Sequence, residues 1–265
     1  MQGIHPSESE PLLIARLASL DLDVVPESFT GRIIRDGIDA TAPAIRRAMS
    51  GARSRHFLIL HEYATSLDFA PHVLLTPHVT RGMPFVPIAY LPYNVGEPVP
   101  FARRTIAASF RGSMTSDLRA KLAGEGAGAP LSSCIIEDSG AFHDHHDATA
   151  RAANHDRYVE LLANSRIAIC PRGAGAATFR FWEALAMGCV PLLISDDLVL
   201  PLEDRIEWDA IVLRLAEKDV DRLQDFVEAQ DDLEAMAEEG HRVWQEWFSP
   251  ENWIRGVAAA VKLRR

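Results

Sequence analysis

The segment 171–178, PRGAGAAT, has the composition of an anion-binding loop. Gly173 and Gly175 have no side chains, so backbone N–H groups there can come close to a ligand, and Arg172 supplies a planar fork of donors that matches phosphate oxygens. An apolar strand pattern precedes the loop, and a helical pattern over 177–187 follows it, with a partial positive charge at its amino end. These features predict a phosphate or diphosphate site. The alternative is a tight strand-to-helix turn with a solvated arginine.

Glu183 lies in the middle of that helical pattern, among the apolar residues of FRFWEALAM. A carboxylate in such surroundings is costly unless hydrogen-bond donors reach it. A ribose offers two hydroxyl donors, and a nucleotide sugar presents both a ribose and a diphosphate. Glu183 is therefore predicted to bind a ribose. A solvent-facing glutamate, or one paired with Arg180 three residues earlier, is the alternative.

Two established phosphate-binding templates differ in how well they fit the loop. A P-loop requires a lysine after its last glycine, and no lysine follows here. The dinucleotide fingerprint GxGxxG fits better, because Gly173, Gly175 and Thr178 occupy its marked positions and Asp196 follows roughly twenty residues later. However, the third position is threonine, and the match falls on the third strand–helix unit of its domain. An NAD(P)-dependent Rossmann oxidoreductase therefore remains an alternative function.

A polar cluster over 142–147, FHDHHD, contains residue types that bind metals. Adjacent residues on a loop point in different directions, and neither an HxxxH spacing on a helix nor a remote fourth ligand is evident. We expect a polar loop over the ligand site and no metal ion.

Short apolar runs alternate with helical patterns along the chain, and this order predicts an α/β fold with mostly parallel sheets. Strands are expected over 56–60, 72–75, 84–90, 105–110, 133–137, 166–170, 190–194 and 210–215, and helices over 11–20, 40–49, 115–123, 152–164 and 177–187. Three prolines and a glycine over 91–104 indicate a boundary between one domain at 1–98 and another at 99–265.

The composition is that of a globular protein with a sizeable core, since 48% of the 265 residues are hydrophobic. A formal net charge of −10 argues against nucleic-acid binding. No run approaches the roughly 18 apolar residues of a membrane span, and the N-terminus lacks a signal pattern. The widely spaced Cys134, Cys170 and Cys189 lie in or beside apolar runs, which indicates buried free thiols in a reducing compartment. We expect a cytoplasmic protein.

The segment 170–215 resembles the C-terminal signature of the exostosin family of glycosyltransferases. The shared features are a Cys-Pro-Arg-Gly loop, a helix with an acid before alanine, a Gly-Cys-hydrophobic-Pro turn and an apolar strand that ends in Ser-Asp. LPLE and IEW within 200–208 keep the later part of the pattern with small departures. Upstream, FRG over 110–112 with Arg119, and the strand-end HEY over 61–63, also resemble this family.

The resemblance implies a GT-B-like fold, in which two Rossmann-like domains face a cleft and the C-terminal domain holds a nucleotide-sugar donor. It implies an inverting, metal-independent glycosyltransferase of polysaccharide biosynthesis, with no cofactor, that transfers a sugar from a nucleotide-diphosphate sugar to a glycan or other hydroxyl acceptor. A UDP-sugar is the expected donor. The missing signal anchor indicates a soluble, bacterial-type member. Because the N-terminal part is short for this family, that domain is expected to be reduced, and a non-catalytic nucleotide-sugar-binding protein is a third possibility.

Within this mechanism, Glu62 is expected to be the catalytic base, because it ends an apolar strand on the N-terminal side of the cleft. His61 is the neighbouring option, since imidazole also titrates near neutral pH. An ordinary pair of strand-end residues at the surface is the alternative for both.

The donor is expected to contact residues at the ends of several strands in the C-terminal domain. Arg111 and Arg172 are assigned to the diphosphate, because without a metal ion cations and N–H donors must meet the charge of the leaving group. Gly112 and Glu137, which lie at the ends of two further strands, complete the predicted donor-binding set.

Overall fold

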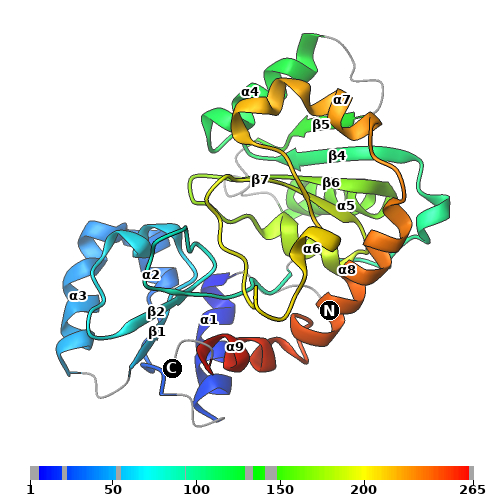
Figure 1. Ribbon diagram of the computed structural model, residues 1–265. Helices are drawn as coiled ribbons and strands as arrows, with labels where there is room; N and C mark the ends of the chain where they lie inside the picture. The colour runs from blue at the N-terminus through cyan, green and yellow to red at the C-terminus, as the bar shows by residue number, and fades with distance from the viewer. Residues whose placement is uncertain are drawn as a thin grey trace.

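The computed structural model describes residues 6–19, 23–51, 55–92, 94–128, 134–140 and 148–262. Within this part of the chain there are two parallel sheets, a smaller one in the order β1-β2-β3 and a larger one in the order β5-β4-β6-β7-β8 (Figure 1). The strands are β1 (His56–Leu58), β2 (Val73–Thr76), β3 (Val86–Pro87), β4 (Ile106–Gly112), β5 (Cys134–Asp138), β6 (Ser165–Pro171), β7 (Val190–Ile194) and β8 (Leu213–Arg214). The expected α/β class with parallel sheets is confirmed, although β3 and β8 are shorter than predicted.

The helices flank both sheets. They are α1 (Pro6–Ala18), α2 (Thr30–Asp36), α3 (Ile38–Gly51), α4 (Asp117–Gly128), α5 (Ala148–Asn164), α6 (Phe179–Ala186), α7 (Leu223–Glu228), α8 (Leu233–Trp247) and α9 (Trp253–Lys262), with short 3-10 turns η1 (Glu62–Ser66), η2 (Phe101–Arg103), η3 (Trp208–Ala210) and η4 (Glu217–Arg222). The sequence pattern did not predict α2.

The larger sheet is covered on both faces, as its continuous apolar strands require. Successive side chains of a strand point to opposite faces. On β6, Ile167 and Ile169 therefore join the apolar cluster beneath α4 and α7, whereas Ala168 and Cys170 join the cluster beneath α5 and α6. Figure 1 shows α4 and α7 on one side of this sheet and α6 and α8 on the other.

The strand order of the larger sheet reverses next to β4. This strand comes first in the chain but lies between β5 and β6. In open parallel sheets a crevice forms at such a switch point, outside the carboxyl ends of the two strands, and ligands bind there. The topology therefore directs attention to the loops that follow β4 and β6, and the second of these is the predicted anion-binding loop.

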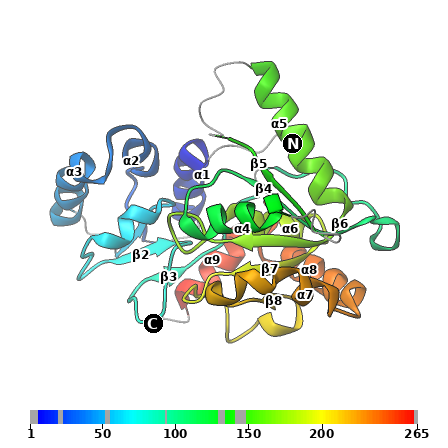
Figure 2. The same ribbon diagram turned by 90° about the horizontal axis from the view of Figure 1, so that it is seen from above.

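One apolar cluster runs through both halves of the chain. It contains Leu58 and Leu75 of the smaller sheet together with Phe181 of α6 and Trp253 of α9. Helix α9 crosses back to the N-terminal half, where the indole N–H of Trp253 donates to the carbonyl oxygen of Ala89 at 2.8 Å. The view from above places α1 between α2 and the larger sheet (Figure 2). The two sheets are thus joined by a shared core, and the domain boundary at 98/99 stays a prediction.

A buried carboxylate fixes the N-terminal half. Glu10 of α1 is fully buried, and one of its oxygens accepts from the backbone N–H groups of Phe29 and Thr30 at 2.7 and 3.0 Å, at the start of α2. The other oxygen accepts from the N–H of Leu60 at 3.2 Å and from the hydroxyl of Thr30. These bonds tie α1 and α2 to the segment that leads from β1 to Glu62.

Two expectations from composition can be compared with the described residues. Cys134, Cys170 and Cys189 are free and buried, as predicted. No helix in the described ranges combines the length and the apolar character needed to span a bilayer. The cytoplasmic location stays a prediction.

Candidate functional site

Arg119 holds together the two loops at the switch point. Its guanidinium donates to the carbonyl oxygens of Arg172 at 3.0 Å, Ser113 at 3.1 Å and Pro171 at 3.2 Å. Burial, with a smaller contribution from the nearby charge of Arg180, lowers the pKa of Arg119 to about 10. Arg119 remains a cation at neutral pH, and its donors fix the loop after β4 against the loop after β6.

Arg180, in the first turn of α6, is a buried cation to which the described part of the chain offers no acceptor. Its side chain lies over the ring of Phe110 at 4.4 Å and over the ring of Tyr158 at 5.1 Å, and the residue is 7% exposed. One of its nitrogens lies 3.1 Å from the place that a Cβ on Gly112 would take. Among the described residues, no oxygen lies at hydrogen-bond or ion-pair distance from this guanidinium. A buried charge is costly unless it is paired, so the arrangement fits an anionic ligand at the carboxyl end of β4.

Glu183 lies one turn further along α6 and is 1% exposed. One carboxylate oxygen accepts from the backbone N–H of Asn94 at 2.8 Å and from its side-chain amide at 3.0 Å, and the other accepts from the hydroxyl of Tyr158. The amide oxygen of Asn94 is buried and has no partner in the described residues. Because Tyr158 also touches Arg180, this polar group adjoins the unpaired cation. The ribose contact predicted for Glu183 stays a prediction.

Arg111 and Glu137, both predicted to bind the donor, lie at the paired ends of β4 and β5 and bind each other. The guanidinium of Arg111 donates to Glu137 at 2.6 Å and to the side-chain oxygen of Asn154 at 2.5 Å. Arg157 donates to the second oxygen of Glu137 at 2.6 Å. Burial works to raise the pKa of Glu137, but the hydrogen bonds from Arg157 and Arg111 outweigh it and lower this pKa. A diphosphate contact of Arg111 stays a prediction and would require an exchange of these partners.

Arg172 has a carboxylate partner too. Its Nε donates to Glu217 of η4 at 2.8 Å, and this hydrogen bond raises the pKa of Arg172. The same oxygen of Glu217 accepts from the N–H of Asp196, at the end of β7. Arg172 therefore links two neighbouring strand ends in this structure, and its predicted phosphate contact is likewise untested.

The structure brings the predicted base against the predicted anion-binding loop. A Cβ placed on Gly175 would lie 2.5 Å from Nδ1 of His78 and closer still to the Cβ of Glu62. One oxygen of Glu62 lies 3.4 Å from Nδ1 of His61 and 3.9 Å from Nε2 of His78. The side chain of Glu62 is 26% exposed, so a ligand can reach its carboxylate. Glu62 and His61 thus lie at the boundary between the two halves, and their catalytic role stays a prediction.

His78 is a site residue that the sequence did not single out. It is 5% exposed, follows β2 and reaches the loop after β6, where its Nδ1 lies 3.3 Å from the N–H of Ala177. Its Nε2 lies 2.5 Å from the hydroxyl of Tyr90. Burial lowers the pKa of His78 to about 3, with a smaller contribution from His61. The only signal in the sequence was its place just after a predicted strand.

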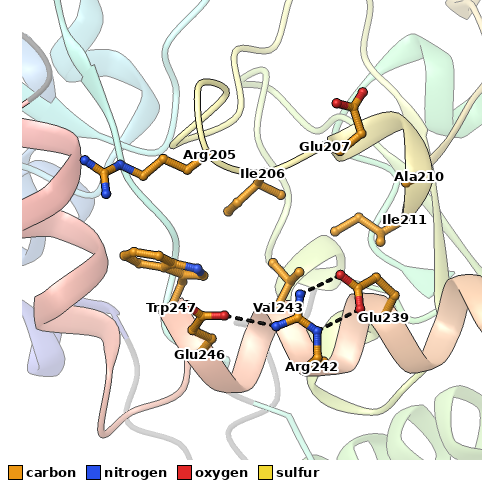
Figure 3. A pocket seen from close by; sticks show the side chains of 10 residues that line it. All are labelled: Arg205, Ile206, Glu207, Ala210, Ile211, Glu239, Arg242, Val243, Glu246 and Trp247. Atoms are coloured by element: carbon orange, nitrogen blue, oxygen red, sulfur yellow. Dashed lines mark hydrogen bonds and ion pairs between the residues drawn. The ribbon is translucent and has the colours of Figure 1, made fainter.

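A separate cavity of about 270 Å³ lies between α8 and the loop over 205–211 (Figure 3). None of the predicted site residues lines it. Arg242 points along its floor, between Glu239 at 2.6 Å and Glu246 at 3.0 Å. Because this cation already has two carboxylate partners, we assign no ligand to the cavity.

A metal site is not evident among the residues that the structure describes. They contain no group of three or more His, Cys, Asp or Glu side chains that could hold an ion. The cluster over 142–147 lies outside the described residues.

The topology defines an α/β protein with a switch point in its larger parallel sheet, and Arg180 is a buried cation beside that point. Comparison with known proteins gives the family: the Exostosin GT47 domain matches residues 71–229, and the chain belongs to this family. Exostosin-1 homolog of Caenorhabditis elegans is 47% identical over 62 residues, which are 23% of this chain and 16% of that protein. Exostosin-1 of Drosophila melanogaster is 34% identical over 93 residues, which are 34% of this chain and 12% of that protein.

A solved structure titled "Crystal Structure of TarM" aligns with 83% of this chain and 46% of its own, at a TM-score of 0.47 and 10% identity. The aligned segments span less than a fifth of the two exostosins, so family membership does not by itself transfer their activity.

Proposed function

We propose that this protein is an inverting glycosyltransferase that transfers a sugar from a nucleotide-diphosphate sugar, a UDP-sugar, to a hydroxyl group of a glycan. One observation carries the proposal. Arg180 is a buried cation for which the described residues supply no acceptor, at the switch point of the larger sheet in an exostosin domain. A metal-independent transferase needs such a cation to meet the charge of the leaving diphosphate.

The donor lies across the carboxyl edge of the larger sheet in this proposal. The diphosphate binds to Arg180 and to N–H groups of the loop before α6, whose amino end favours an anion. The ribose binds beside Glu183, where the unpartnered amide oxygen of Asn94 accepts from a hydroxyl group. Arg111 and Arg172 give additional contacts to the diphosphate, after Arg111 has released Glu137 and Arg172 has released Glu217.

Glu62 acts as the base in the transfer step. It removes the proton of the acceptor hydroxyl while that oxygen attacks the anomeric carbon, and the bond from this carbon to the diphosphate oxygen breaks on the opposite face. The contact between Glu62 and Gly175 supports this role, because it brings the base next to the loop that binds the leaving group. A cytoplasmic location and a role in polysaccharide assembly belong to the same proposal.

The oxidoreductase alternative is less well supported by the topology. In dinucleotide-binding sheets the glycine fingerprint follows the first strand. Here the first strand of the larger sheet is β4, which ends at Gly112 and is followed by Ser113-Met114-Thr115, whereas the partial fingerprint follows β6.

Thermal shift with UDP, a UDP-sugar, a GDP-sugar and NAD tests the ligand class. A ligand at about 100 times its dissociation constant stabilises the fold by about 2.7 kcal/mol. We expect stabilisation by UDP and by a UDP-sugar, and stabilisation by NAD alone would refute the transferase. Release of UDP from a panel of UDP-sugars, with and without pooled glycan acceptors, then separates a catalyst from a non-catalytic binding protein.

Two substitutions test the assigned roles. Arg180→Gln should weaken UDP binding roughly ten- to a hundredfold, because it removes a charge-assisted contact of about 1.5–3 kcal/mol. Glu62→Gln should leave UDP affinity unchanged and abolish sugar transfer. Arg166→Gln, an exposed arginine at the amino end of β6, is the matched control. UDP affinity of Arg180→Gln equal to that of the control would contradict the diphosphate assignment.

A further inference from the structure

His78 lies where the two halves of the chain meet. It follows β2 at the carboxyl end of the smaller sheet, and its buried ring has a polar neighbour on each side. On one side Nε2 lies 2.5 Å from the hydroxyl of Tyr90. On the other side Nδ1 lies 3.3 Å from the N–H of Ala177, in the loop that precedes α6. Both ring nitrogens therefore have hydrogen-bond partners: the partner of Nε2 lies in the N-terminal half and the partner of Nδ1 in the C-terminal half.

The hydrogen bonds fix which nitrogen of His78 carries the proton. The hydroxyl of Tyr90 has a single proton and donates it to the carbonyl oxygen of Leu60 at 3.0 Å. At the contact with His78, Tyr90 therefore accepts and Nε2–H donates. A neutral imidazole has only one N–H, so Nδ1 carries a lone pair and accepts from the N–H of Ala177. The low pKa of His78, about 3, agrees with this neutral form, because a protonated ring could not accept that bond.

The hydrogen bond between His78 and Ala177 lies next to the amino end of α6, where the loop turns into the helix. Ala177 directly precedes Thr178, the N-cap residue of α6, and Gly175 packs against both His78 and Glu62. A hydrogen bond at Ala177 thus holds the loop against the N-terminal half, beside Glu62, the proposed base.

We propose that His78 is a positioning residue for nucleotide-diphosphate binding. The lone pair on its Nδ1, directed by the Tyr90 hydroxyl, holds the amide of Ala177 so that the neighbouring N–H groups of the loop face the diphosphate. His78 has no free nitrogen with which to touch the donor or the acceptor, so it acts through the loop. This inference rests on the proposed transferase function.

Two substitutions at His78 separate its two nitrogens. In His78→Asn the amide oxygen stands as many bonds from Cβ as Nδ1 does, so it keeps an acceptor for Ala177. In His78→Gln the amide reaches the place of Nε2 and the acceptor is lost. Tyr90→Phe keeps the ring but removes the group that fixes the tautomer. His72→Gln, at the opposite end of β2, is the matched control.

Calorimetric titration with UDP and with GDP is the first readout. We expect His78→Gln and Tyr90→Phe to weaken the better-bound nucleotide about five- to tenfold, the effect of losing one net hydrogen bond. His78→Asn should recover most of this loss, and the control should bind like the wild type. Equal weakening in His78→Asn and His78→Gln, or none in either, would overturn the inference. Wild type that binds neither nucleotide would instead refute the transferase proposal.

Nitrogen-15 spectra of the histidines and amide exchange give a second readout that needs no ligand. The wild type should show a protonated Nε2 and an unprotonated Nδ1 on His78, with a protected amide at Ala177. That amide should exchange faster in His78→Gln and in Tyr90→Phe than in His78→Asn. A protonated Nδ1 in the wild type, or equal exchange in all variants, would overturn the positioning role whether or not a nucleotide binds.

Discussion

The contact of Gly175 with Glu62 and His78 allows a test of how close the loop before α6 must lie to the N-terminal half for activity. In Gly175→Ala the added carbon would lie 2.5 Å from Nδ1 and 2.8 Å from Cε1 of His78, and closer still to the Cβ of Glu62. Carbon atoms in contact are normally about 3.5–4.0 Å apart, so the groups must separate by about 1 Å. The buried ring of His78 is bonded on both sides, and the loop is therefore the part that moves.

This displacement should affect activity more than stability. Overpacking of this kind costs about 1–3 kcal/mol of folding free energy, whereas a shift of about 1 Å between catalytic groups costs about a hundredfold in rate. We expect kcat/KM for UDP release from the preferred UDP-sugar to fall about a hundredfold, and scanning calorimetry to show a Tm lower by several degrees.

Gly124→Ala is the control, because a Cβ at that position in α4 meets no atom within 4 Å and alanine favours a helix. It should keep full activity and the wild-type Tm or a slightly higher one. If Gly175→Ala matched this control in both measurements, the close approach of Glu62 to the loop would not exist in solution, and the assignment of Glu62 as the base would lose its geometric support.

Two predictions concern stability. Glu10→Gln should lower the free energy of unfolding in urea by about 1–3 kcal/mol, because its amide group would turn donors toward the buried N–H of Leu60. The control Glu27→Gln, at an exposed position, should change this free energy little. Equal effects of the two substitutions would contradict the role of the buried carboxylate. His78 has a folded pKa near 3 against about 6.5 when unfolded, so the unfolded chain binds the extra proton between these values and stability is lost as pH falls from 6.5 to 3. His78→Asn should reduce this slope by up to about 1.4 kcal/mol per pH unit in urea titrations, and an unchanged slope would mean that the ring is solvated.

The α/β class, most strands and the loop before α6 could be predicted from the sequence because they depend on local patterns, whereas the order of the strands within each sheet could not. Apolar strands, the glycine loop and the acid in α6 are neighbours along the chain. The prediction also placed Glu62 opposite that loop, and the structure brings it against Gly175.

The partners of the charged groups could not be read in this way. Arg111 meets Glu137, 26 residues away, and Arg172 meets Glu217, 45 residues away. A single sequence shows which residues are charged but not which of them neutralise one another. The sequence therefore suggested Arg180 only as a possible partner of Glu183, whereas the described residues give its buried guanidinium no acceptor.

The shared core also limits how the N-terminal half can be exchanged with that of a related protein. Leu58 and Leu75 pack in the same apolar cluster as Phe181 and Trp253, so the N-terminal half does not have a core separate from that of the C-terminal half. A chimera that takes this half from a relative must inherit the facing surfaces of α6 and α9 along with it. If the two halves bind acceptor and donor as proposed, a change in the N-terminal half also alters the packing around α6 and α9, so a new N-terminal half would have to be selected together with these helices.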